Sequence, residues 1–312
     1  MPNLSIKSQG AVEYLITHAW AILIIVIVIA VLATLGLFSA NNQPTVPPGS
    51  CQVQRPYGVN TTQQLSLIGA CRNGLPEFVA ELGPTSYINT SIGFVPGWGG
   101  GFSDSAWFYL DTLPPGSYYS AVTNIGASGE PGFAIDVDSS GDLLALYATS
   151  PCNIFGASIS CNWQTVYVDN VVKTGQWYFV EQNVSFSGRT ESVCIGASGS
   201  ALTCNSINLG GSTTLFSGNA HGLLYQIGND TFSDNFNGMI SNVQYYDRSL
   251  SSNEINDIYG SGIGGVPIDI YHLIGWWPLN GNANDYSGNQ YNGNAIGGVR
   301  YTAGWINSYT RP

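Results

Sequence analysis

The sequence contains little charge, and most of it is acidic. Only 9% of the 312 residues are charged, with 8 Lys and Arg against 19 Asp and Glu, which gives a net charge of −11. A chain without a basic patch cannot neutralise the phosphates of nucleic acid, so nucleic acid is excluded as a partner. Three histidines and the lack of any C-x-x-C pair also argue against a zinc site. The abundant Gly, Ser, Asn and Tyr suit an exposed surface that depends on amides and hydroxyls for solubility.

Charge is absent between residues 13 and 55, and residues 19–38 are almost all apolar. A helix that is apolar on every face belongs in a bilayer or in the dry centre of a helical bundle. The pattern predicts a transmembrane or assembly helix over residues 9–40, because about 20 apolar residues span roughly 30 Å of hydrocarbon. Two alternatives stay open here: an uncleaved anchor with no further role, and a secretory signal peptide.

The start of this segment resembles the N-terminus of archaeal type IV pilins. Those proteins carry a short leader that is cut before a Gln, with a Glu at the fifth mature position and an apolar helix behind it. Residues 1–8 would be the leader, and a cut between Ser8 and Gln9 would make Glu13 the fifth mature residue. The resemblance implies that Glu13 pairs with the N-terminal amine of a neighbouring pilin subunit. The alternative is a Glu that only lies among lipid headgroups.

Features of an extracellular domain follow the apolar helix. Residues 41–50 are rich in Pro and Asn and predict an extended linker, and residues 51–85 form a cysteine-containing lead-in. Because Lys7 precedes the helix and all six cysteines follow it, we place residues 41–312 outside the cell. The cysteines predict disulfides in an oxidising compartment, with sequential pairing: Cys51–Cys71, Cys152–Cys161 and Cys194–Cys204. N-x-S/T sequons after the helix mark candidate glycosylation sites on surface turns: Asn60, Asn89, Asn183 and Asn229.

Beyond residue 86 the sequence alternates with the period of two that is typical of half-buried strands. Ser251 and Glu254 form a predicted capping box, which begins a helix that we expect to end at Gly260. The predicted fold class is therefore mainly β, with an N-terminal transmembrane helix followed by an antiparallel β-sandwich. Strands are predicted in six aromatic or β-branched runs between Gly, Ser and Asn turns: residues 105–111, 133–137, 143–147, 165–168, 176–184 and 239–246.

Two motifs resemble laminin-G-like, concanavalin-type jelly rolls. Residues 236–255 look like the closing strand and short helix of that family, and residues 102–109 look like an early strand. The resemblance covers residues 86–260. Residues 275–295 resemble the opening motif of the same family, although they follow the closing one. The C-terminal segment 261–312 therefore either completes the jelly roll in a permuted arrangement, which we expect, or begins a second copy.

Candidate ligand sites are few. Concanavalin-type glycoside hydrolases usually place their carboxylates on one strand as E-x-D-x-x-E, and this sequence has no such run. Trp276 and Trp277 are candidates for stacking on a sugar, and the alternative is a pair divided between the core and the surface. The loop that follows them is rich in oxygen ligands, and the alternative for it is a structural Asx-turn loop. Its candidate Ca²⁺ ligands are Asn280, Asn282, Asn284 and Asp285.

These patterns predict a membrane-inserted, pilin-like protein of the cell surface, with a single membrane pass and an extracellular jelly roll that binds or adheres without catalysis. The expected partners are the membrane, identical or related pilin subunits, and a carbohydrate or surface glycoprotein. No cofactor is required, and Ca²⁺ is the candidate ion. Two alternatives stay open: a single-pass anchored surface lectin that never assembles, and an anchored carbohydrate-active enzyme. An acidic pair in a cleft would favour the enzyme.

Overall fold

The computed structural model describes residues 18–19, 23–28, 50–54, 64–68, 75–126, 131–155, 158–211, 214–219, 222–229 and 236–312. The chain divides into two compact units, residues 1–47 and 48–312. In the first unit, residues 18–19 and 23–28 are helical. None of the helices in the described part of the chain is long and apolar enough to cross a membrane. The predicted processing and assembly residues Ser8, Gln9 and Glu13 lie outside that part.

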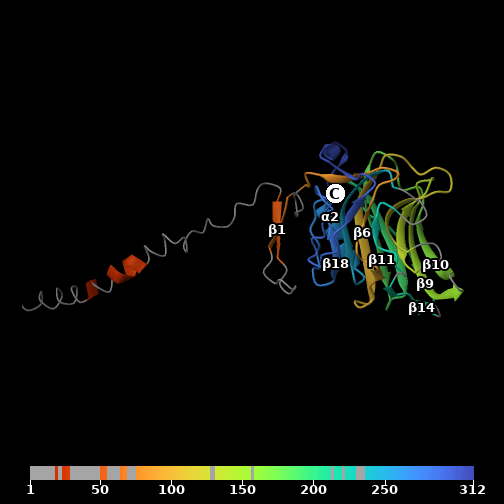
Figure 1. The fold of residues 1–312 in the computed structure, drawn as a ribbon, viewed down its shortest axis with the longest axis horizontal. Coiled ribbons are helices and arrows are strands. Elements are labelled where there is room, and N and C mark those ends of the chain that lie inside the picture. Colours follow the sequence, from red (N-terminus) through yellow and green to blue (C-terminus); the bar gives the residue numbers. More distant parts are fainter. Residues whose placement is uncertain are drawn as a thin grey trace, which may run out of the picture. The chain divides into compact units, whose positions relative to one another are not determined.

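The second unit is an antiparallel β-sandwich of two large sheets (Figure 1). Sheet 1 has the strand order β10-β9-β8-β7-β16-β4-β19, and β14 also pairs with β9. Its strands are β4 (Tyr87–Asn89), β7 (Ser120–Ile125), β8 (Phe133–Val137), β9 (Leu143–Phe155), β10 (Ser158–Val168), β14 (Thr214–Leu215), β16 (Gln226–Ile227) and β19 (Asn294–Ile296).

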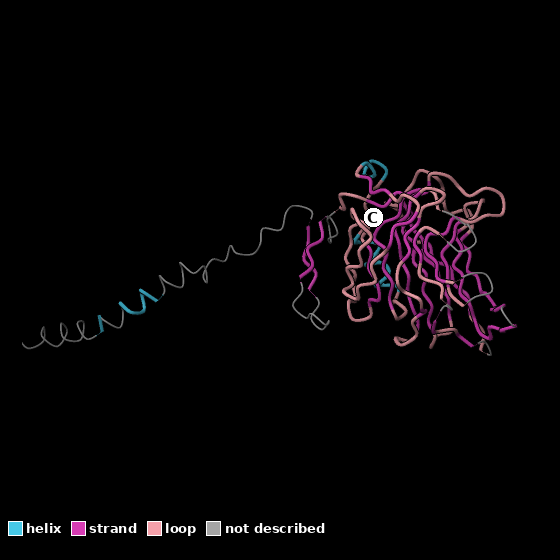
Figure 2. The backbone as a smooth tube through the Cα atoms, viewed as in Figure 1, coloured by secondary structure: helices cyan, strands magenta, loops and turns pink. Residues whose placement is uncertain are grey.

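Sheet 2 has the strand order β13-β12-β11-β6-β17-β3-β20, and β18 also pairs with β17. Two small antiparallel pairs join β1 to β2 and β5 to β15, and strands dominate the described chain (Figure 2). The strands of sheet 2 are β3 (Val79–Leu82), β6 (Gly101–Leu110), β11 (Trp177–Ser185), β12 (Thr190–Ala197), β13 (Thr203–Asn208), β17 (Gly238–Tyr246), β18 (Leu273–Trp277) and β20 (Arg300–Thr302). The small pairs are β1 (Ser50–Gln54), β2 (Gln64–Ile68), β5 (Phe94–Val95) and β15 (Gly218–Asn219).

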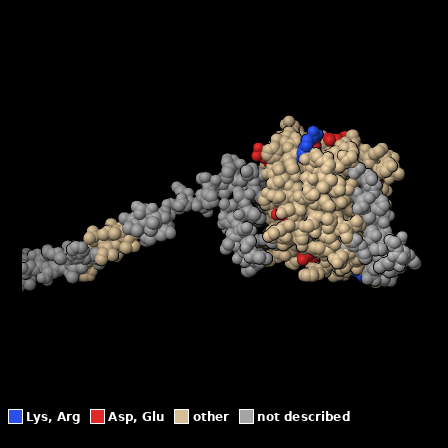
Figure 3. All heavy atoms as spheres, viewed as in Figure 1, with Lys and Arg blue, Asp and Glu red and all other residues tan. Residues whose placement is uncertain are grey.

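A continuous apolar core fills the space between the two sheets. Alternate residues of β6, among them Phe102, Ala106 and Phe108, belong to this core, and Val180 and Val184 join it from β11. This is the alternation expected of strands whose neighbouring side chains point to opposite faces. The predicted antiparallel sandwich is confirmed. Charged side chains are sparse on the face of the molecule drawn in Figure 3, in keeping with the composition.

The outer face of sheet 2 carries a second apolar cluster, so this part of the protein is three layers deep. Trp107 of β6 points into it and stacks on Tyr259 of helix α2 (Ser252–Ser261), with ring centroids 5.8 Å apart. The 3₁₀-helix η1 (Gly304–Ser308) adds Trp305 to the same cluster. Because both faces of β6 are covered, nearly all of its residues are buried.

Helix α2 begins as the sequence predicts. The Ser251 hydroxyl accepts a hydrogen bond from the Glu254 N–H, and the Glu254 carboxylate accepts one from the Ser251 N–H at 2.8 Å, so both halves of the capping box are present. The predicted end is two residues early. Gly260 continues the helix, and the chain leaves it at Gly262, whose φ of 77° lies in the left-handed region that glycine adopts easily.

Strands from the C-terminal segment 261–312 take part in both sheets. β18 pairs with β17 and β20 pairs with β3 in sheet 2, whereas β19 pairs with β4 in sheet 1. β3 itself comes from the region 51–85 that the sequence assigns to a lead-in, so the sandwich includes residues on both sides of the predicted jelly roll. The segment that resembles an opening motif thus completes existing sheets and does not start a separate one.

Candidate functional site

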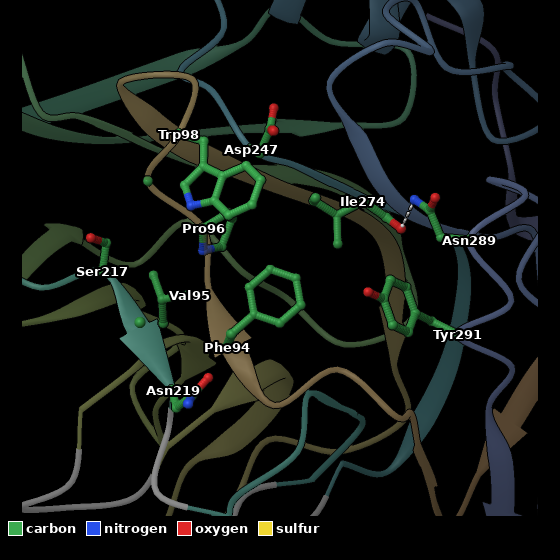
Figure 4. Close-up of a pocket in the computed structure, with 12 residues that line it drawn as sticks. Phe94, Val95, Pro96, Trp98, Ser217, Asn219, Asp247, Ile274, Asn289 and Tyr291 are labelled. Carbon is green, nitrogen blue, oxygen red and sulfur yellow. Dashed lines mark hydrogen bonds between the residues drawn. The ribbon is translucent and has the colours of Figure 1, made fainter. Parts of the chain in front are cut away.

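A pocket of about 510 Å³ is formed by residues that lie far apart in the sequence and make up three sides (Figure 4). Residues 94–98 include β5 and the turn after it, and residues 217–219 include β15. These two segments are joined by strand pairing, with Phe94 opposite Asn219. The third side comes from later in the chain and consists of Asp247, Ile274, Asn289 and Tyr291.

Three aromatic side chains give this pocket its chemical character. Trp98 is 98% exposed, on a Pro-Gly-Trp-Gly-Gly turn. Phe94 and Tyr291 are half-buried and meet edge to face, with ring centroids 6.4 Å apart. Figure 4 shows all three rings bordering the cavity. Exposed aromatic faces of this kind can stack on the apolar face of a ligand.

The core of the sandwich holds two walls of the pocket in place. Trp277 Nε1 donates to the carbonyl oxygen of Tyr291 at 2.9 Å, and the Tyr245 hydroxyl donates to the carbonyl oxygen of Phe94 at 3.3 Å. The Tyr225 ring stacks on both supports, 5.2 Å from Tyr245 and 5.3 Å from Trp277 between ring centroids. Packed core rings therefore preorganise the backbone of two pocket residues, which lowers the ordering cost of binding.

Asp247 is the one carboxyl group among the lining residues that the structure describes. Its backbone carbonyl accepts a hydrogen bond from the Gly99 N–H at 2.9 Å, which ties the turn that carries Trp98 to the end of β17. Its Oδ1 atom is buried without a hydrogen-bond partner. Burial raises the pKa of this carboxyl, and the charge of nearby His272 opposes the rise. One oxygen of this carboxyl is thus both unpaired and closed off from solvent.

The cations close to Asp247 are bound to other carboxylates. Arg248 donates to Glu254 and to Asp269, each at 2.6 Å, and His272 Nδ1 lies 2.9 Å from the Asp269 carboxylate. The hydrogen bonds from Arg248 hold the pKa of Glu254 at about 2. The part of the pocket lining that the structure describes includes no Lys, Arg or His. Its local charge is therefore acidic.

Three other carboxyl groups, none of them among the lining residues, are completely buried, with 0% of each residue exposed. Asp104 of β6 accepts hydrogen bonds from the Thr123 and Tyr225 hydroxyls, yet burial raises its pKa to about 7. Burial also raises the pKa values of Glu181 and Glu191 well above the usual range. Buried carboxyls of this kind favour the neutral form. They face the interior and cannot meet a ligand at the pocket.

The two predicted ligand-stacking residues are both buried, with 0% of each exposed. Trp277 lies in the core between the sheets, and Trp276 lies in the outer cluster, where its Nε1 donates to Asn242 Oδ1 at 2.8 Å. Gly275 makes room for this packing, because a Cβ there would lie 2.2 Å from the Trp277 ring. Neither ring offers a face to a sugar, so the predicted stacking role does not fit. Trp277 supports the pocket from the core, through its hydrogen bond to Tyr291 and its stacking on Tyr225.

Asp285, a predicted Ca²⁺ ligand, uses its carboxylate to organise its own loop. One oxygen accepts the N–H groups of Trp276 at 3.0 Å and Ser287 at 2.7 Å. The other accepts the Ser287 hydroxyl at 2.8 Å and the Tyr291 N–H at 2.9 Å. These contacts match the alternative of a structural Asx-turn loop. They also position Tyr291 at the pocket.

The neighbouring asparagines make similar contacts. Asn280 Oδ1 accepts the Phe78 N–H at 2.8 Å, and Asn282 Oδ1 accepts the Asn284 N–H at 2.9 Å. Because these oxygens already accept hydrogen bonds from backbone N–H groups, fewer of their lone pairs are free to bind a cation. Within the described residues, no group of three or more His, Cys, Asp and Glu side chains gathers as metal ligands would.

The predicted Cys194–Cys204 disulfide is present and joins directly opposed residues of β12 and β13. Cys161 is also disulfide-bonded. The side chains of Cys51, Cys71 and Cys152 lie outside those described, so their pairing stays a prediction.

The sequons do not all lie on surface turns. Asn89 lies in β4 and Asn183 in β11, so the turn prediction is wrong for both. The Asn183 amide donates to the Leu250 carbonyl oxygen at 2.8 Å, a bond that a glycan would displace. Asn229 is 9% exposed, and Asn60 lies outside the described residues.

None of the pocket residues is singled out by the sequence patterns above. A usable signal exists for Trp98, since a Trp in a turn of Pro and Gly has no strand to carry it into a core. Asn289 and Tyr291 lie in the loop that was predicted to bind Ca²⁺, but their role depends on residues about 70 to 200 positions earlier. Only the folded sheets bring these segments together.

Comparison with known proteins gives the family. A model described as the Concanavalin A-like lectin/glucanases superfamily (Laminin_G_3) matches residues 82–256, more than half of the chain. A search of curated proteins found no match.

Solved structures with a similar fold include a heptameric SAP-like pentraxin from Limulus polyphemus, at 12% identity over 72% of this chain and 94% of that chain, with a TM-score of 0.44. Another is the CBM40 of the Ruminococcus gnavus IT-sialidase, at 11% identity over 58% and 97%, with a TM-score of 0.37. A third is the binding domain of botulinum neurotoxin serotype D, at 14% identity over 77% and 54%, with a TM-score of 0.39. The predicted jelly roll is confirmed, and the chain belongs to the Laminin_G_3 family of concanavalin A-like proteins.

Proposed function

We propose that the jelly roll is a lectin-like, carbohydrate-binding domain and that the Trp98 pocket is its ligand site. The observation that carries the proposal is the 98% exposure of Trp98 beside a cavity of about 510 Å³. An exposed indole that borders a cavity together with two other aromatic rings forms the kind of contiguous apolar surface that marks a ligand-binding groove. The family description as lectins and glucanases supports the same class of ligand.

The remaining lining fits a sugar. The rings of Trp98, Phe94 and Tyr291 offer apolar faces for the C–H face of a pyranose. Asn219 and Asn289 bring amides to the same cavity, and Asp247 brings a carboxyl. Asn289 is held in place because its amide donates to the Ile274 carbonyl oxygen at 2.8 Å (Figure 4). Apolar walls with a few fixed polar groups are typical of small-ligand sites.

The domain binds without catalysis in this proposal. Glycoside hydrolysis uses two carboxyl groups about 5–10 Å apart. The pocket lining holds one, Asp247, and the buried Asp104, Glu181 and Glu191 are not among its residues. The carbohydrate-active enzyme, the alternative from the sequence, needs an acidic pair that this lining does not supply.

The test is a glycan array with the full chain, followed by titration calorimetry on the glycans that bind. Trp98→Ala should weaken binding about 30-fold, because truncating a Trp hot spot commonly costs about 2 kcal/mol or more. Tyr118→Ala is the matched control, since Tyr118 is 57% exposed and lies outside the lining. Equal binding by the Trp98 variant and the wild type would remove this pocket as the site.

We further propose that residues 9–40 insert into a membrane as a pilin-like segment and that the jelly roll lies outside the cell. The spacing of Gln9 and Glu13 ahead of the apolar run supports this. N-terminal sequencing of the protein from its native membrane should find Gln9 first, and Met1 there would contradict processing. Glu13→Ala should reduce incorporation into filaments while the jelly roll stays folded. A processed protein that never enters filaments would support the anchored lectin instead.

A further inference from the structure

The described lining of the Trp98 pocket is acidic, which does not suit an anionic sugar. The described lining residues include one carboxyl group, Asp247, and no Lys, Arg or His. The cation that follows Asp247 in the sequence, Arg248, is held by two carboxylates, Glu254 and Asp269, at 2.6 Å each. Among the described lining residues, no positive side chain is therefore available to balance a ligand carboxylate.

We propose that this pocket selects neutral, hydroxyl-rich glycans and rejects glycans with a carboxylate, and that Asp247 determines this specificity. The inference rests on the proposed carbohydrate-binding function. An ionised Asp accepts hydrogen bonds and donates none, so it matches the hydroxyl groups of a neutral sugar. A sialic or uronic acid would bring a second acceptor with the same charge to the same wall.

The geometry supports Asp247 in this role. The N–H of Gly99 donates to the Asp247 carbonyl oxygen, so the backbone of Asp247 and the Trp98 turn are fixed to each other. Oδ1 of Asp247 has no hydrogen-bond partner within the protein. Because Oδ1 is also closed off from solvent, Asp247 acts on a sugar stacked at Trp98 mainly through the charge of its carboxylate.

The size of the selection follows from the charges. Two like charges about 4 Å apart repel enough to weaken binding by about tenfold or more near a solvated surface. The net charge of −11 adds a longer-range repulsion, which salt screens beyond about 8 Å at physiological ionic strength. We expect neutral glycans to bind at least about tenfold more tightly than their carboxylate-bearing forms.

The experiment measures affinities of the full chain for a panel of neutral oligosaccharides and for the same oligosaccharides capped with sialic acid. Asp247→Asn should bring the two affinities closer together, because the amide keeps the shape and removes the charge. Asn219→Asp should widen the gap, because it adds a second carboxylate to the lining. Asn219 is exposed, so this second variant keeps the test sharp even where Asp247→Asn fails to fold. Thermal unfolding checks both variants.

The outcomes separate the two claims. Binding that depends on Trp98, favours the neutral forms and shifts as stated with both variants supports the inference. Binding that depends on Trp98 but is equal or tighter for the sialylated forms overturns it and leaves the carbohydrate site standing. The same holds if Asn219→Asp leaves the ratio of the two affinities unchanged. A panel without any Trp98-dependent binding refutes the proposed function itself, and the inference with it.

Discussion

Replacement of Trp277 by alanine tests how the core supports the pocket. The indole is fully buried between the sheets, stacks on Tyr225 at 5.3 Å and donates from Nε1 to the Tyr291 carbonyl oxygen at 2.9 Å. Truncation of a buried Trp to Ala costs about 3–5 kcal/mol, including the cavity that is left. The lost hydrogen bond accounts for about 1 kcal/mol of that sum.

The expected change is large but leaves a folded protein to measure. Domains usually have a free energy of unfolding of about 5–15 kcal/mol, so a domain in the upper part of that range stays folded after a loss of about 3–5 kcal/mol. For a domain of this size each kcal/mol lowers Tm by roughly 2–4 °C, so Trp277→Ala should lower it by about 6–20 °C. Binding should also weaken below Tm, because Tyr291 loses its support.

The assay is thermal and urea unfolding of the full chain by circular dichroism, beside glycan titration at a temperature where the variants are folded. Trp98→Ala is the crossed control. Its side chain is 98% exposed, so it should change the free energy of unfolding by less than about 0.5 kcal/mol while binding falls. A Trp277→Ala protein that melts within about 2 °C of the wild type would refute the reasoning. So would a Trp98→Ala protein that loses as much stability as Trp277→Ala.

Three further changes test other parts of the structure. Deletion of residues 266–312 removes β18, β19, β20 and η1 and should abolish cooperative unfolding. Deletion of residues 1–47, a separate compact unit, should leave it intact. A sandwich that melts normally without residues 266–312 would contradict the sheet pairing. Burial raises the pKa of Asp104 to about 7 in the folded state. The folded protein therefore binds more protons than the unfolded chain between about pH 4 and pH 7. Its free energy of unfolding should fall as the pH rises through that window, by up to roughly 4 kcal/mol. Asp104→Asn should make the free energy of unfolding, measured with urea at pH 4, 5.5 and 7, depend less on pH. Glu181 and Glu191 contribute a dependence of the same sign, so some of it should remain. The same pH dependence in the variant and the wild type would contradict the role of Asp104. Chelation with EDTA should leave Tm unchanged, because the oxygens of Asp285 and Asn280 already accept backbone N–H groups, and a clear fall would favour the Ca²⁺ alternative.

Local pattern accounts for much of the fold. The period of two predicts the main strands, and the Ser251–Glu254 capping box predicts the start of α2, because both signals depend on residues close together in the sequence. The Trp276–Trp277 pair shows where local pattern stops. The burial of Trp277 follows from the alternation along β18. Trp276 is buried by an outer layer that includes α2 and η1, and the alternation of residues in β18 does not predict that layer.

The candidate site is harder to predict for the same reason. Trp98, Asn219 and Tyr291 meet only because β5 pairs with β15 and the C-terminal loop is held by Trp277. Asp104 occupies an inward position of β6 between Phe102 and Ala106, where an apolar residue is expected. Its partners, the hydroxyls of Thr123 and Tyr225, come from other strands, so the sequence does not show why a carboxyl is tolerated there.

The second apolar layer on sheet 2 also determines when this protein can finish folding. Tyr301 of β20 pairs with Ala80 of β3, and the Trp305 ring packs against Trp177, so residues made late complete strands made early. A growing chain therefore carries apolar side chains on both faces of β6 and β11, and the outer face stays incompletely covered until residues 300–309 join helix α2 there. Topologies with such distant pairings fold slowly, and exposed apolar faces favour aggregation meanwhile. The interval between synthesis of β11 and arrival of η1 is when this chain most needs protection from its neighbours.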